Sequence, residues 1–100
     1  MALTELRFVR AFRTASSERF LALQGENDVA AIDLHFLTNG QVAGTVVVLS
    51  DAIADSDMAD LLRCIDDDLL PGASMESGSV SFAVVRGKFI GNYVPQPEEP

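Results

Sequence analysis

Asp33 and His35 are the two residues whose types and spacing come closest to a reactive pair. They stand two positions apart in a run of strand-forming residues, so their side chains should project from the same face of a strand. A carboxylate beside an imidazole can orient the ring and favour its charged form, as in many general acid–base pairs. Two polar residues on one sheet face also occur wherever a face is partly hydrated or forms an interface. The pair is therefore a candidate catalytic site that does not by itself specify a reaction.

The remaining residues predict neither a metal site nor a cofactor. A single histidine and a single cysteine, Cys64, cannot build the usual zinc constellations. The acidic residues between positions 51 and 60 lack the central glycine and closing glutamate of a calcium loop. The sequence contains no glycine-rich motif for nucleotide phosphates and no nucleophile elbow. Cys64 should lie on a helix flank near several aspartates, among them Asp60 and Asp68, whose charges disfavour the reactive thiolate.

The composition predicts one small soluble domain that binds neither nucleic acid nor membranes. One hundred residues with 48% hydrophobic side chains can bury a single core. The formal net charge of −8 would repel nucleic acid and anionic lipid, although four of the seven basic residues lie among the first twenty positions. No run approaches the roughly 20 apolar residues of a membrane helix, and arginines interrupt the start where a secretory signal would have its apolar centre. We therefore expect a cytoplasmic protein.

A predicted hairpin over residues 28–50 must position Asp33 and His35. Two runs of strand-forming residues flank Asn39-Gly40, the dipeptide that best tolerates a tight hairpin turn. If these two residues are the turn, His35 faces Gly44 across the hairpin. The glycine would then leave an open space beside the imidazole ring.

The same register divides this hairpin into two largely apolar faces. The first carries alternate residues of 30–36 and of 43–49. The second carries Asp33 and His35 among the candidate binding residues, which are Val29, Ala31, Leu37, Val42, Gly44, Val46 and Val48. Each face needs a cover, because a bare apolar face of several hundred Å² is unusual on a soluble monomer.

Two segments should extend the structure on the N-terminal side of the hairpin. Apolar residues recur at helical spacing through residues 4–15, with arginines on the other side, so we predict a helix there, with a strand as the alternative. Residues 19–24 resemble a short strand, and a four-residue turn at 25–28 would pair Leu23 with Ala30. The apolar pattern then continues across three antiparallel strands.

A helix is predicted after the hairpin. Apolar residues follow helical spacing at Met58, Leu61, Leu62, Ile65 and Leu69. Asp55, Ser56 and Asp57 are candidates for the helix N-cap, and Pro71-Gly72 should end the helix. The helix should therefore cover about 57–70, with a loop over 72–78.

The C-terminal region predicts two more strands, over residues 79–85 and 88–94. They would form a hairpin around Arg86-Gly87, with Phe82 lying over Gly91. The alternative is one long strand with a kink at Gly87. Residues 95–100, with three prolines and two glutamates, predict a disordered tail.

The sequence thus predicts an α+β domain over residues 1–94. Its elements follow the order (α)βββαββ, with about five antiparallel strands and the 57–70 helix packed on one face. The second hairpin face favours a non-catalytic interaction or regulatory module, a homodimer or a binder of another protein. The alternative is a small ligand-binding or acid–base catalytic domain that uses Asp33 and His35 beside Gly44. A small ligand is possible on this second hypothesis, but no motif indicates one.

Overall fold

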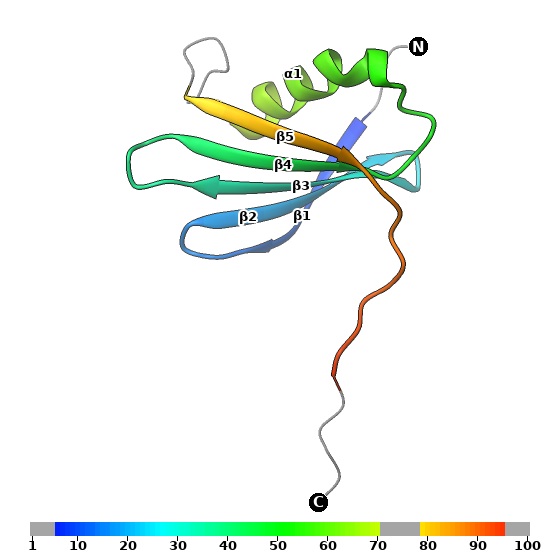
Figure 1. Ribbon diagram of the computed structural model, residues 1–100, viewed down its shortest axis with the longest axis horizontal. Helices are drawn as coiled ribbons and strands as arrows, with labels where there is room; N and C mark the ends of the chain where they lie inside the picture. The colour runs from blue at the N-terminus through cyan, green and yellow to red at the C-terminus, as the bar shows by residue number, and fades with distance from the viewer. Residues whose placement is uncertain (1–5, 71–78, 96–100) are drawn as a thin grey trace, which may run out of the picture.

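The computed structural model describes residues 6–70 and 79–95, which form one five-stranded sheet and one helix (Figure 1). The strands lie in chain order across the sheet, and their bounds are β1 Leu6–Arg13, β2 Ser17–Gln24, β3 Asn27–Phe36, β4 Val42–Val48 and β5 Val80–Arg86. A short 3-10 turn, η1 Asp55–Asp57, runs directly into the helix α1 Met58–Leu69. The predicted helix and the predicted number of strands are confirmed, and the chain has an α+β fold.

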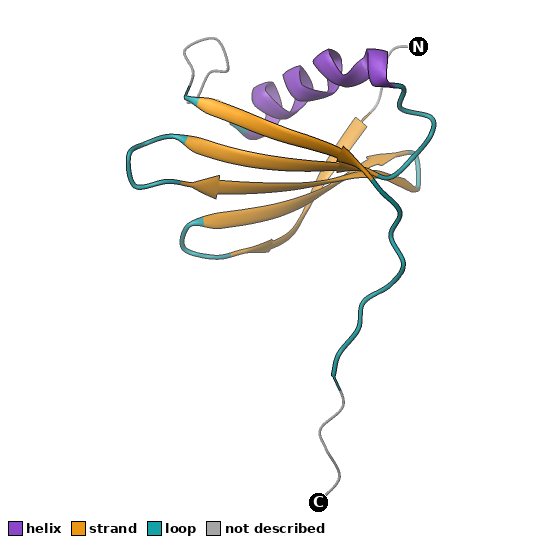
Figure 2. Cartoon of the chain, in the orientation of Figure 1, coloured by secondary structure: helices purple, strands orange, loops and turns teal. Residues whose placement is uncertain are grey.

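The helix covers one face of the sheet (Figure 2), and the core lies between them. Strand residues alternate between this covered face and the opposite one, as the period of a strand requires. Leu61 and Ile65 supply the buried stripe of the amphipathic helix. The buried apolar residues are Phe20, Ala22, Val29, Ala30, Ile32, Leu34, Val42, Val46, Val48, Ile53, Leu61, Ile65, Leu70 and Val80.

The first three strand pairs are antiparallel, but β4 and β5 are parallel. The chain leaves the end of β4, crosses the sheet as α1 and re-enters beside the start of β4, so β5 runs in the same direction. The predicted antiparallel hairpin over 79–94 is therefore wrong. The last β4–β5 pair is Val48 with Arg86, and residues 87–95 continue without belonging to a strand, because β4 has ended.

The predicted N-terminal helix is also wrong, because its described part is the edge strand β1. Arg10 pairs with Phe20 and Phe12 with Arg19, so the residue between them, Ala11, is an extra residue in the ladder. This β-bulge turns Phe12 to the face opposite that of Phe8. The strand therefore lacks strict alternation, and its broken pattern imitates the spacing of a helix.

The β3–β4 register differs by one residue from the predicted one. The turn is a three-residue loop in which the N–H of Leu37 donates to the carbonyl of Gln41 at 2.8 Å, and Gly40 takes the left-handed position with φ 84°. His35 consequently pairs with Ala43, and Leu34 pairs with Gly44. A one-residue shift moves every β4 side chain to the other face.

The β2–β3 pairing is shifted as well. The connection is the two residues Gly25 and Glu26, with φ 65° at the glycine, instead of four. Ala22 pairs with Ala30, which corrects the predicted pairing of Leu23 with Ala30. A second bulge follows, so that Leu23 pairs with Asp28.

Gly44 makes room for an aromatic ring from β5. It pairs with Phe82 on the covered face, and a Cβ at Gly44 would lie only 2.5 Å from Cε1 of that ring. The space predicted beside His35 is thus on the other face and is filled. The predicted placement of Phe82 over Gly91 is wrong for the same reason.

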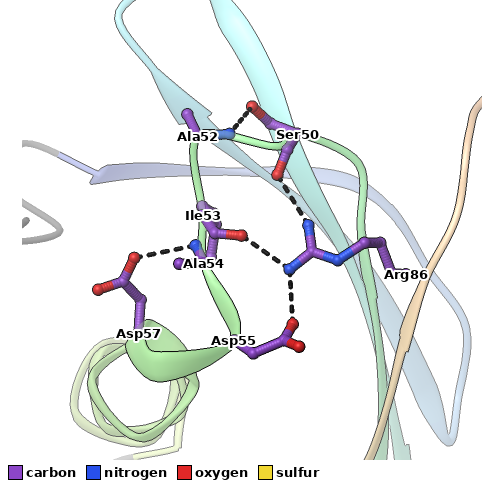
Figure 3. A network of polar contacts seen from close by, with 7 residues as sticks. All are labelled: Ser50, Ala52, Ile53, Ala54, Asp55, Asp57 and Arg86. Carbon is purple, nitrogen blue, oxygen red and sulfur yellow. Dashed lines mark hydrogen bonds and ion pairs between the residues drawn. The ribbon is translucent and has the colours of Figure 1, made fainter.

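Arg86, the last residue of β5, ties the β4–α1 connection to the sheet (Figure 3). Its guanidinium donates to the carbonyls of Ser50 at 3.1 Å and Ile53 at 2.8 Å, and to Oδ1 of Asp55 at 2.9 Å. On the helix side of this loop, the N–H of Ala54 donates to Oδ2 of the buried Asp57 at 3.0 Å. These contacts determine where α1 begins relative to the sheet.

We predict that Gly44→Ala lowers the free energy of unfolding by about 1–3 kcal/mol, because the new methyl group would overlap the ring of Phe82. Urea denaturation followed by circular dichroism measures the change. Gly91→Ala is the matched control, since its nearest atoms are at 3.6 Å or beyond, and it should be within about 0.5 kcal/mol of wild type. Equal stability of the two variants would contradict the packing described for Gly44.

Arg86→Met should destabilise the fold by about 1–2 kcal/mol, because two backbone carbonyls lose a charged donor. Asp55→Asn is the control. The Asp55 side chain is 95% exposed, so weakening its ion pair should change stability by less than about 0.5 kcal/mol. Thermal unfolding compares the two variants. If Asp55→Asn costs as much as Arg86→Met, the ion pair rather than the carbonyl contacts holds the connection.

Candidate functional site: the open face of the sheet

The sheet face opposite α1 has no cover among residues 6–70 and 79–95, and we call it the open face. A row of apolar residues crosses it in register, one from each strand: Val9, Leu21, Ala31, Val47 and Val85. The two edge members of the row are the most accessible, with 43% of Val9 and 51% of Val85 exposed. The open face therefore presents a continuous apolar band across its full width.

The next row of the open face is built around an ion pair. Nε and Nη2 of Arg19 donate to the two carboxylate oxygens of Asp33 at 2.6 and 2.9 Å, a bidentate arrangement. The guanidinium of Arg19 also lies over the ring of Phe12, 5.0 Å from its centroid. Phe12 reaches this face only because of the bulge at Ala11. The row thus places one aromatic and two charged side chains next to one another.

The ion pair organises the surface more than it stabilises the fold. The hydrogen bond to Asp33 raises the pKa of Arg19, and partial burial opposes this shift. The Arg19 side chain is 46% exposed, and exposed pairs of this kind contribute about 1 kcal/mol or less. The two charges cancel, so this part of the open face carries no net charge despite the acidity of the chain.

A broad hollow of about 920 Å³ lies over the open face. Apolar side chains make its floor, and the extended residues that follow β5 close one side. The lining residues are Ala11, Phe12, Arg19, Leu21, Asp28, Ala31, Asp33, Val47, Leu49, Lys88, Phe89 and Asn92. A mainly apolar hollow with a few charged groups is suited to receive a side chain or an extended peptide.

Asp33 and His35 share the open face, as predicted, but they do not form a pair with each other. Both carboxylate oxygens of Asp33 are bonded to Arg19. His35 is exposed, pairs with Ser17 and Ala43, and its ring makes no hydrogen bond within the described residues. The two side chains therefore do not make the carboxylate–imidazole contact that the sequence suggested.

The predicted binding residues are divided between different environments. Ala31 lies on the open face, and Leu37 is exposed near the β3–β4 turn. Val29, Val42, Gly44, Val46 and Val48 are all buried, the last four beneath the helix. The register prediction had placed these β4 residues on the wrong face.

Sequence reasoning missed Arg19, Phe12, Leu21 and Val47 as members of the surface. Arg19 and Asp33 carried a usable signal, since opposite charges on neighbouring antiparallel strands often face each other. That signal would have corrected the β2–β3 register. Phe12 carried no comparable signal, because the bulge that turns it outward is not visible in the sequence.

Cys64 lies half-buried on α1, away from the open face. Burial, followed by the charges of Asp68, Asp60 and Asp67, raises the pKa of its thiol. The thiolate is therefore disfavoured at neutral pH. No group of three metal-binding side chains occurs in the part of the chain that the structure describes.

No protein-family model, curated protein or solved structure matches this chain. No helix among the described residues is long and apolar enough to span a membrane.

Cys64 should react with iodoacetamide more slowly in the folded protein than in the urea-unfolded chain, because its raised pKa reduces the thiolate fraction at pH 7.5. The reaction should accelerate as the pH increases. Asp68→Asn removes the largest of the charge effects and should speed labelling, whereas Asp51→Asn, in the β4–α1 connection, should not. Mass spectrometry measures the rates. Identical rates for the two variants would show that Asp68 does not act on the thiol.

Proposed function

We propose that this protein is a non-catalytic interaction module that self-associates through the open face. The observation that carries the proposal is the apolar row from Val9 on β1 to Val85 on β5, which crosses all five strands without a cover among the described residues. Such a row would be costly to leave in water, and a second copy of the chain can cover it.

The size of the open face is compatible with an interface. Five strands about 4.8 Å apart and seven residues long, at about 3.3 Å each, give a surface of roughly 450 Å². Two copies together would bury roughly 900 Å², of which about half is apolar, and at about 25 cal/mol per Å² this contributes on the order of 11 kcal/mol before the cost of ordering two molecules. Less an association cost of at least about 4 kcal/mol, this gain corresponds to a dissociation constant of about 10 μM or weaker, so contact between two faces alone gives a weak dimer.

The charge distribution also favours this face over the others. The open face combines Arg7 and Arg19 with Asp28 and Asp33, so its charges balance, whereas the chain as a whole carries −8. Two copies would repel each other least when they approach through such a neutral surface. The acidic residues of α1 then remain on the outside.

Chemistry by Asp33 and His35 is not part of this proposal. Asp33 is bound to Arg19, and the open space expected at Gly44 belongs to the covered face. An ordered ion pair beside an apolar band is typical of a surface that positions a partner.

Sedimentation velocity from about 1 to 100 μM tests the proposal, and we expect a concentration-dependent dimer. Val85→Asp should raise its dissociation constant by at least about tenfold, because it buries an unpaired carboxylate at the interface. Val84→Asp is the matched control. Val84 is the preceding residue on the same edge strand, 37% exposed, and faces the other way, so its variant should associate like wild type. A wild-type monomer at all concentrations, or equal effects of the two variants, would refute the proposal.

A further inference from the structure

The segment that follows Gly87 is an extended apolar arm, residues 88–94. It belongs to no strand and runs away from the sheet (Figure 1). Among the large apolar side chains of the described residues, those of the arm are the most exposed. The accessible fractions are 62% for Phe89, 80% for Ile90, 79% for Tyr93 and 86% for Val94. Four such side chains in seven residues are more than a soluble surface usually leaves uncovered.

The arm begins at the hollow of the open face. Lys88, Phe89 and Asn92 form one side of this hollow, whereas Tyr93 and Val94 do not line it. In its own chain the arm therefore lines one side of the hollow and does not occupy it. The floor, with Leu21, Val47 and their apolar neighbours, remains open to a segment that comes from elsewhere.

We infer that the arm of one copy lies in the open-face hollow of a second copy, so that two chains exchange arms in a dimer. This inference rests on the proposed function and deepens it by naming the segment that binds the face. Each chain supplies one hollow and one arm, and both contacts form together in a closed two-fold pair.

The dimensions of the two parts agree. Seven extended residues span about 23 Å, and five strands span about 19 Å from the first to the last. An arm that leaves the side of its own hollow can thus cross the full width of the partner sheet. Its aromatic rings would lie along the apolar row and take the place of direct contact between the two faces. The only charge of the arm is that of Lys88, which is positive in a chain of net charge −8. The hollow offers the Asp28 carboxylate, which makes no hydrogen bond or ion pair within the described residues.

A stable dimer also buries more area than the open face alone supplies. A stable dimer usually buries about 800 Å² on each partner, and the open face supplies roughly 450 Å². Two aromatic side chains, Phe89 and Tyr93, add on the order of 300 Å² when they are buried. The arm therefore supplies the area that contact between two faces would lack.

The test uses two variants of the full chain. The arm variant carries Ile90→Ser and Tyr93→Ser. Both native side chains are about 80% exposed, so their replacement should not change folding. In the hollow variant, Ala31→Arg fills the floor between Leu21 and Val47. Circular dichroism and thermal unfolding check that each variant keeps the fold.

Arm exchange predicts that the arm variant weakens dimerisation by about 100-fold, because both arm contacts are lost. The hollow variant alone should be equally weak. An equimolar mixture should recover a heterodimer only about tenfold weaker than wild type, because one intact arm and one intact hollow remain. Sedimentation velocity with one variant fluorescently labelled measures all three.

Each other outcome has a distinct meaning. If the arm variant dimerises like wild type, while Val85→Asp still disrupts the dimer, the faces associate without the arms and only the inference is overturned. If both variants are weak and their mixture stays monomeric, the arms do not exchange, and the inference is again overturned. If wild type is monomeric, and hydrogen exchange shows its arm to be protected, the arm covers its own face, and both the inference and the proposed function fail.

Discussion

The pairing of β3 with β4 is the constraint on which the rest of this structure depends. The three-residue loop with Gly40 in the left-handed conformation places Leu34 opposite Gly44, and this register assigns Val42, Val46 and Val48 to the helix. The glycine in turn admits the ring of Phe82, which brings β5 against β4. A shift of one residue would expose the β4 valines and bury Thr45, so the register, the core and the β5 position are set together.

A single helix can cover only one side of a five-stranded sheet, so the other side has no cover among the described residues. The chain uses its helix as a parallel crossover, held at its start by the contacts of Arg86 with the β4–α1 connection. The described chain then has no second layer for the open face. The face keeps an apolar row and, beside it, an ion pair whose charges balance.

Several elements could be predicted because local residue patterns determine them. The spacing of apolar residues from Met58 to Leu69 specifies the helix, and the strand-forming runs on either side of Asn39-Gly40 specify a hairpin. The candidate pair Asp33 and His35 was placed correctly on one face, since residues i and i+2 of a strand cannot separate. The wrong predictions concern features that no local pattern in the sequence indicates. The bulge at Ala11 gave β1 the apolar spacing of a helix, and the extra loop residue, Thr38, moved the β4 side chains to the opposite faces.

The sequence by itself determined the class of this protein: an acidic α+β domain with one amphipathic helix, a hairpin at its centre and more apolar surface than one helix can cover. Only the tertiary structure decided which residues form that uncovered surface and that Arg19, rather than His35, is the partner of Asp33. It also decided that the last strand runs parallel and releases residues 88–94 as an arm. The physical reason is that periodicity specifies a strand and its two faces, whereas register and direction arise from turns, bulges and long-range packing.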